Sequence, residues 1–206
     1  MKIGIMGGTF DPIHKGHLMI ATEAKKQFNL DKIWFLPNGH PPHKEYHKIS
    51  SSVKDRLKMV ELAIDEIENF ELNTYETDKE STSYSYSTLE YFRSIYQDSQ
   101  FYFILGADSL LSLESWKYPQ RVLDSCVILA AYRDEMDTKE EMEEQIIHLK
   151  EKFNGDIRLI DSPVLPISSH QIREGLLSGD KQDEMKEMLP LKVFQYIKEN
   201  HLYENF

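Results

Sequence analysis

Two histidines near the N-terminus carry the first chemistry that the sequence suggests. His14 and His17 are three residues apart and follow a pair of glycines, Gly7 and Gly8. At the entry to a helix, this spacing lets both imidazoles face the same side. The glycines let the backbone approach a ligand, and the first turn of a helix offers N–H groups and a partial positive charge to an anion. Amides and two imidazoles in such a place fit the phosphates of a nucleotide.

A second candidate anion site lies far along the chain, in the segment ISSHQIR at residues 167–173. Ser168 and Ser169 can cap a helix there and hold phosphate oxygens, and the guanidinium of Arg173 can bind phosphate through two donors. On its own, the segment is better explained as a helix cap with a solvent-facing arginine. Together with the histidine pattern, it predicts a second contact to phosphate.

The elements that must position these residues follow from the hydrophobic pattern. Short apolar runs predict strands at residues 2–6, 31–37, 70–74, 101–105, 126–131 and 157–160. Helical spacing and caps predict helices from Lys15, over 52–67, 88–96 and 138–152, from Ser168, and over 191–199. This alternation predicts an α/β fold with a doubly wound, mostly parallel sheet covered by helices on both faces. We expect one domain, residues 1–206.

Each chemically suggestive segment follows a predicted strand. In open α/β sheets, ligands bind at the carboxyl ends of strands, near a reversal in the strand order. The segments should therefore converge on one crevice. They are residues 7–17, 38–44, 81–88, 106–108 and 168–173.

Composition restricts the class of partner. The chain has 24 Lys and Arg against 35 Asp and Glu, a formal charge of −11, which disfavours a nucleic-acid partner. No apolar run approaches the length of a membrane span, so no membrane association is predicted. Cys126 is the only cysteine and lies in an apolar run, which predicts a buried small side chain and a cytoplasmic protein. The glycine spacing G-x-x-G-G differs from the dinucleotide fingerprint G-x-G-x-x-G.

Several motifs together resemble those of the bacterial nicotinate-nucleotide adenylyltransferases. Residues 7–17, GGTFDPIHKGH, match the nucleotidyltransferase signature G-G-[TS]-F-D-P-x-H-x-G-H at every position. Residues 36–44 resemble the L-P-x-x-x-P-P-H-K loop, residues 103–116 the F-I-x-G-A-D-x-L-x-x-L-x-x-W segment, and residues 167–173 I-S-S-T-x-I-R. His170 and Ser85 replace the usual threonines of the last motif and of S-Y-T-x-x-T-L.

The resemblance implies a Rossmann-like fold with a small C-terminal helical part, and an enzyme of NAD biosynthesis. Such an enzyme joins nicotinate mononucleotide to the AMP part of ATP, giving deamido-NAD and pyrophosphate. Mg²⁺ would enter with ATP, and no protein ligand set for a metal is expected. The implied catalytic residues are His14, His17 and Arg173. The implied ATP-binding residues are Gly7, Gly8, Thr9, Phe10, Gly16, Gly106, Asp108, Ser168 and Ser169, and the implied substrate-binding residues are His43, Lys44, Ser85 and Trp116.

Two other functions compete with this one. Phosphopantetheine adenylyltransferase shares the fold and a similar N-terminal motif, but it lacks the P-P-H-K loop and the S-S-x-x-I-R segment. A nucleotide-sensing module could keep the fold without turnover, although it would not need every phosphate contact. The sequence leaves open the preference for nicotinate over nicotinamide mononucleotide, the closure of loops on binding and the formation of a homo-oligomer.

Overall fold

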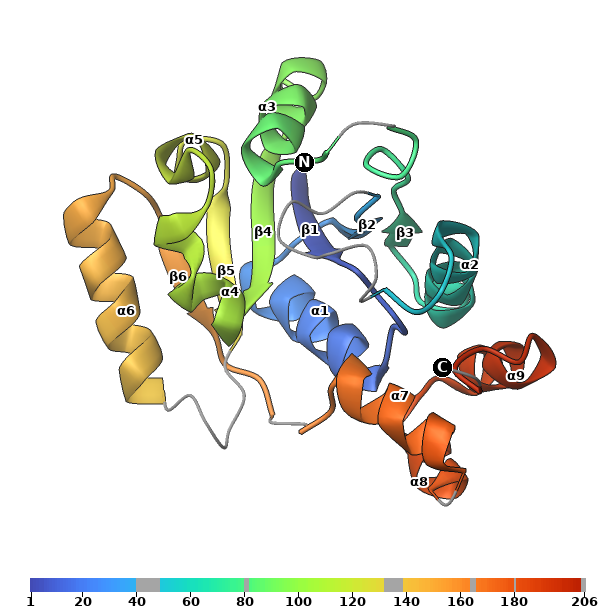
Figure 1. Ribbon diagram of the computed structural model, residues 1–206. Coiled ribbons are helices and arrows are strands. Elements are labelled where there is room, and N and C mark those ends of the chain that lie inside the picture. Colours follow the sequence, from blue (N-terminus) through green and yellow to red (C-terminus); the bar gives the residue numbers. More distant parts are fainter. Residues whose placement is uncertain (40–48, 80–81, 132–138, 164–165, 180, 205–206) are drawn as a thin grey trace.

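The computed structural model describes residues 1–39, 49–79, 82–131, 139–163, 166–179 and 181–204. Within these residues, six parallel strands form one sheet in the order β3-β2-β1-β4-β5-β6 (Figure 1). The strands are β1 (Lys2–Gly8), β2 (Lys32–Pro37), β3 (Phe70–Leu72), β4 (Gln100–Gly106), β5 (Val127–Ala131) and β6 (Ile157–Ile160). The sheet confirms the predicted Rossmann-like α/β fold.

The order of the strands reverses between β1 and β4. From β1 the chain winds outward through β2 to β3, and it then returns to place β4 against the other side of β1. Met6 of β1 lies in register with Phe35 of β2 and with Ile104 of β4, so the three strands end at the same edge of the sheet. This edge is the place where the fold is open to a ligand.

The strands are apolar on both sides because helices cover both faces of the sheet. On the first face, α1 (Lys15–Phe28), α2 (Val53–Ile64), α7 (Ser169–Ser178), α8 (Gln182–Met188) and α9 (Leu191–Glu199) contribute to one hydrophobic cluster. On the second face, α3 (Ser85–Ile95), α4 (Ala107–Leu111), α5 (Pro119–Leu123) and α6 (Lys139–Lys152) contribute to another. A short 3₁₀ turn, Leu113–Ser115, follows α4.

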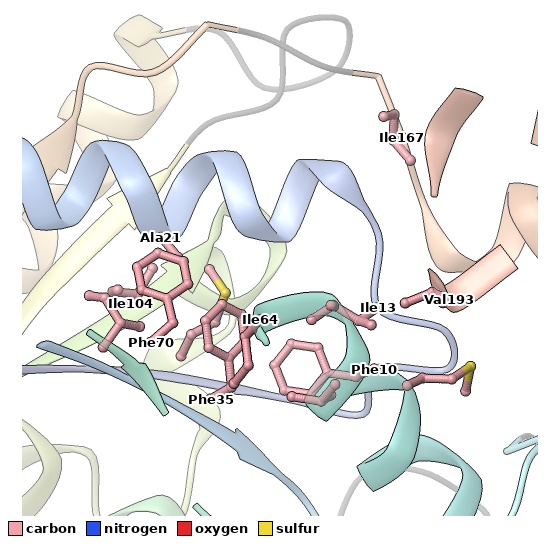
Figure 2. Packing of buried hydrophobic residues seen from close by; sticks show 14 of the residues in the cluster. Phe10, Ile13, Ala21, Phe35, Ile64, Phe70, Ile104, Ile167 and Val193 are labelled. Atoms are coloured by element: carbon pink, nitrogen blue, oxygen red, sulfur yellow. The ribbon is translucent and has the colours of Figure 1, made fainter. Parts of the chain in front are cut away.

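The first cluster also holds the loop that follows β1. Phe10 and Ile13 of this loop are buried among residues of the sheet and helices (Figure 2). Ile167 approaches from the segment before α7, and Val193 comes from α9. The loop is therefore packed by residues that lie far apart in the sequence, which fixes its position against the C-terminal helices.

Several predicted element boundaries differ from the structure. The helix predicted from residue 88 begins at Ser85, and the helix predicted to residue 67 ends at Ile64. The strand predicted over 70–74 ends at Leu72, the last residue paired with β2. Helix α8 is not among the predicted helices. It lies in an acidic run, and its one buried residue is Met185. No helix in the part of the chain that the structure describes is long and apolar enough to cross a membrane.

We predict that Gly39→Ala destabilises the protein. Gly39 is buried after β2, and a Cβ atom there would stand 2.5 Å from the backbone carbonyl oxygen of Glu76. Because a backbone atom cannot move aside as a side chain can, the free energy of unfolding should fall by about 1–3 kcal/mol. Gly106→Ala is the control: a Cβ there meets nothing within 4 Å. Urea unfolding measures both, and equal stability of the Gly39→Ala variant and the wild type would contradict the prediction.

Candidate functional site

Two cavities open at the ends of β1 and β4. The first, which we call the histidine cavity, has a volume of about 520 Å³ and contains the side chains of both predicted histidines and Arg173. The second, the tryptophan cavity, has a volume of about 530 Å³ and contains Trp116. Gly7, Thr9 and Ser109 line both. The two cavities are thus halves of one crevice at the reversal of the strand order.

The two histidine rings lie against each other at the start of α1. Their centroids are 3.7 Å apart, and His14 is the extended residue that caps the helix. Nδ1 of His17 accepts the backbone N–H of His14 at 3.2 Å. A backbone N–H can only donate, so Nδ1 of His17 is unprotonated and Nε2 carries the ring proton. His17 is therefore fixed as the tautomer that donates through Nε2.

Gly16 has a steric role beside this pair. A Cβ atom at this position would lie 3.1 Å from Nδ1 of His14, closer than a side chain ordinarily packs. Gly16 is buried and lines neither cavity. The absence of a side chain at this position leaves room for the His14 ring, so Gly16 supports the site through the position of His14.

The start of α7 joins the loop after β1 through two side chains. Ser169 Oγ donates to the carbonyl of Pro12 at 2.9 Å, and Arg173 Nη1 donates to the carbonyl of Asp11 at 2.6 Å. Ser168 caps the helix by accepting the N–H of Gln171 at 3.1 Å, and it lines neither cavity. Arg173 is partly exposed to the histidine cavity, where a guanidinium suits an anion.

Asp11 is the buried charge of the site, with 3% of its surface exposed. Its Oδ1 accepts the hydroxyls of Tyr203 at 2.7 Å and of Ser51 at 2.5 Å, and its Oδ2 accepts the N–H of Ser50 at 2.8 Å. Burial and the nearby Asp11 charge raise the pKa of the Tyr203 phenol, so this phenol stays protonated and donates. Burial lowers the pKa of the Arg56 guanidinium, and the charge of Asp11 opposes that shift.

The tryptophan cavity combines aromatic rings, hydroxyls and one buried carboxyl. The Nζ atom of Lys117 lies 4.2 Å from the centre of the Tyr84 ring, and Trp116 meets Phe103 edge to face. Glu76 is 8% exposed and accepts the hydroxyl of Thr88 at 2.8 Å. Burial raises the pKa of Glu76, against the opposing effects of that hydrogen bond and of the Lys79 charge. This half of the crevice suits a flat, polar ring.

The structure brings most of the predicted residues to the crevice. The histidine cavity is lined by Gly7, Thr9, Phe10, His14, His17, Gly106, Asp108, Ser169 and Arg173. The tryptophan cavity is lined by Gly7, Gly8, Thr9, Ser85 and Trp116. His43 and Lys44 lie outside the described residues.

Other residues of the crevice were not predicted. Glu76, Ser109 and Lys117 line it without being among the predicted residues, and Asn38 lies in the predicted segment 38–44 without an assigned role. Ser109 and Lys117 directly follow predicted residues, so adjacency is the signal that could have identified them. Glu76 gave no such signal, since a glutamate in a polar run is usually exposed.

No group of three or more His, Cys, Asp or Glu suited to a metal ion occurs among the residues that the structure describes. Asp11 and Asp108 are the carboxylates that line the histidine cavity in this part of the chain. Cys126 is buried as expected, and burial raises the pKa of its thiol to about 12, so it is not a nucleophile at neutral pH.

Known proteins resemble this chain over almost its whole length. A cytidylyltransferase-like family model matches residues 5–175. The chain is 39% identical over 203 residues to a probable nicotinate-nucleotide adenylyltransferase of Clostridium botulinum (strain Eklund 17B / Type B), covering 98% of each protein. It is 40% identical over 205 residues to the protein of the same description from Clostridium tetani, again covering 98% of each.

Solved structures share the fold. The nicotinic acid mononucleotide adenylyltransferase of Plasmodium falciparum complexed with NaAD superposes with a TM-score of 0.81 at 21% identity, covering 98% of this chain and 97% of that one. The same enzyme complexed with APC gives a TM-score of 0.77 at 22% identity with the same coverage. At this identity, the superposition shows that the folds agree.

We predict that Glu76→Gln stabilises the protein at neutral and alkaline pH. Because the folded-state pKa of Glu76 is raised, ionising this carboxyl costs stability, and the cost grows as the pH rises from the unfolded pKa and is complete above the folded pKa. The cost disappears below the unfolded pKa of about 4.3. Glutamine keeps an acceptor for Thr88, so the variant should melt above the wild type at pH 8 and not at pH 4. Thermal unfolding at both values tests this, with exposed Glu151→Gln as the control; a Glu76→Gln variant less stable than the wild type at pH 8 would disprove it.

Proposed function

The chain belongs to the cytidylyltransferase-like family, within it to the nicotinate-nucleotide adenylyltransferases, and we propose that its two cavities hold the two substrates of that reaction. The enzyme transfers the AMP part of ATP to nicotinate mononucleotide, giving deamido-NAD and pyrophosphate in NAD biosynthesis. Identity of about 40% over the full length favours this reaction over phosphopantetheine adenylylation.

One observation carries the assignment of the cavities: they meet at Gly7, Thr9 and Ser109. The reaction requires the phosphate of nicotinate mononucleotide to reach the α-phosphate of ATP. Two nucleotides bound with their phosphates toward these shared residues would place the reacting atoms together. Holding two reactants in this way can supply about 7–11 kcal/mol of the barrier.

ATP would occupy the histidine cavity. Its phosphates would meet the N-terminus of α1, the Nε2 proton of His17 and the guanidinium of Arg173, which are donors suited to an anion. The open space at Gly106 would admit the nucleoside close to the backbone. Asp108, exposed at the first turn of α4, is placed to accept hydrogen bonds from the ribose.

Nicotinate mononucleotide would occupy the tryptophan cavity. Trp116 and Tyr84 offer ring faces to the pyridine, and Ser85 lies at the first turn of α3. Lys117 adds a positive charge to the wall, which suits a substrate that carries both a phosphate and a carboxylate. His43 and Lys44 remain candidates for this half on the strength of the loop motif alone.

The phosphate of nicotinate mononucleotide is the nucleophile, and it is ionised at neutral pH. No serine, cysteine or lysine nucleophile is then needed, so the side chains only align two anions and stabilise the charge that develops on the leaving pyrophosphate. His14, His17 and Arg173 carry this role. We infer that Mg²⁺ arrives with ATP and is held chiefly by phosphate and water, since Mg²⁺ takes few protein ligands. We also infer that the chain acts as one domain in the cytoplasm.

Pyrophosphate release tests the function directly. The protein is mixed with ATP and Mg²⁺ and, in parallel, with nicotinate mononucleotide, nicotinamide mononucleotide or phosphopantetheine. We expect rapid release with the nicotinate substrate, and EDTA should stop it. Release with phosphopantetheine alone would overturn the assignment of the tryptophan cavity. ATP binding without release from any of the three would support a sensor.

We predict that His17→Ala lowers turnover by about 10²–10³-fold, because it removes a donor aimed at the charge that develops in the transition state. The matched control is His148→Ala, an exposed histidine of α6 outside the crevice. Steady-state kinetics at saturating ATP measures the loss, and thermal unfolding checks that the variant is folded. Wild-type turnover with near-normal ATP affinity would remove His17 from the mechanism.

A further inference from the structure

A tyrosine near the C-terminus reaches the loop that begins the active site. Tyr203 follows α9, and its hydroxyl donates to Oδ1 of Asp11 across 192 positions of sequence at 2.7 Å. It also lies 3.2 Å from Oγ of Ser51. Only 4% of Tyr203 is exposed, and its ring belongs to the first hydrophobic cluster. The hydroxyl is thus a buried polar group placed on a buried charge.

Side chains of α2 and α7 bind the backbone carbonyls of the loop after β1. The carbonyl of Thr9 accepts Arg56 Nη1 of α2 at 2.8 Å, while the carbonyls of Asp11 and Pro12 accept side chains of α7. The Asp11 carboxylate supplies the remaining attachment, to Tyr203, Ser51 and the N–H of Ser50. The same loop then leads directly into His14 and α1.

Tyr203 itself does not line either cavity, whereas Asp11 lines the histidine cavity. The hydrogen bond to Asp11 is therefore the direct link between Tyr203 and the wall of this cavity. Tyr203 also lies beyond the family model's match, which ends at residue 175. Asp11 belongs to the motif at residues 7–17, whereas its partner Tyr203 belongs to none of the motifs of the site.

We propose that Tyr203 is a positioning residue for ATP: its hydroxyl fixes the Asp11 carboxylate and so holds the loop from Thr9 to His14 in its binding geometry. The identity of the ligand rests on the proposed function. A loop with one attachment removed samples other positions, and the phosphate donors at its end lose alignment. The tryptophan cavity shares only Thr9 with this loop, and the Thr9 carbonyl is held separately by Arg56, so binding of nicotinate mononucleotide should respond much less.

The test compares Tyr203→Phe with a matched control. Phenylalanine keeps the ring in the cluster and removes only the hydroxyl. Tyr196→Phe is the control, because the Tyr196 hydroxyl also donates to a carboxylate, that of Asp55 in α2, at 2.9 Å and outside both cavities. Both variants lose a C-terminal hydroxyl bound to a carboxylate, so both should lose some thermal stability.

Direct binding separates positioning from stability. A non-hydrolysable ATP analogue is titrated by calorimetry, and nicotinate mononucleotide by the fluorescence of tryptophan, well below the melting temperature of each variant. We expect Tyr203→Phe to raise the Kd of the ATP analogue by about 3- to 10-fold, because the lost hydrogen bond to a charged group, worth more than about tenfold, acts on the ligand only indirectly through the loop. The Kd of nicotinate mononucleotide should change by less than about twofold, and Tyr196→Phe should leave both values unchanged.

Equal affinity of Tyr203→Phe and the wild type for the ATP analogue would overturn the proposal, as would a parallel loss of affinity for both ligands. Ser51→Ala provides a second route, since it removes the other hydroxyl from the same oxygen of Asp11. It should weaken ATP binding in the same selective way. This test can fail independently of the proposed function. If the protein bound ATP through this loop but formed no deamido-NAD, the positioning role of Tyr203 would stand and the proposed reaction would be wrong.

Discussion

The structure depends on one buried carboxylate. Asp11 lies in the loop after β1 with 3% of its surface exposed, and an ionised group in such a place must be fully hydrogen-bonded. Its partners are Ser50 and Ser51 just before α2 and the C-terminal Tyr203, while Arg173 of α7 donates to its carbonyl and lies 4.0 Å from its Oδ2. Satisfying this charge draws three distant segments onto one loop. The same contacts set the position of the histidines that follow it.

The parallel sheet provides the frame for this arrangement. Since all six strands run in the same direction, their carboxyl ends lie at one edge, and the reversal between β1 and β4 opens a crevice there. β1 supplies the loop with the histidines, and β4 supplies Gly106 and the turn toward Trp116. The two halves of the crevice differ in kind, one rich in donors for anions and the other lined by aromatic rings. That difference matches a reaction between a triphosphate and a pyridine nucleotide.

Much of the fold and the chemistry could be predicted from the sequence because both are encoded locally. Apolar runs indicate the six strands, and the motif at residues 7–17 places its glycines and histidines in one short segment between β1 and the start of α1. The partners of Asp11 could not be predicted in this way. Tyr203 stands among mostly polar residues near the C-terminus. Arg56, which holds the neighbouring carbonyl of Thr9, lies on the buried side of α2 although arginine is a residue type that is usually exposed. Their roles arise only when the chain folds.

Helix α3 begins three residues earlier than the sequence pattern predicts. Serines alternate at residues 81–87, and serine favours turns and caps over helix interiors, so the predicted helix starts only at residue 88. The helix nevertheless begins at Ser85, where the buried contact between Thr88 and Glu76 joins its first turn to the segment after β3. A tertiary contact thus outweighs local preference. It also moves Ser85 to the wall of the tryptophan cavity.

The central claim is that the two cavities form one continuous site in which the substrates meet. Titration with deamido-NAD, which contains both nucleotide parts, tests it most directly. We expect the product to bind with a stoichiometry of one and to displace both a non-hydrolysable ATP analogue and nicotinate mononucleotide. Displacement of only one ligand, or simultaneous binding of the product with either, would show that the cavities act separately and would contradict the account.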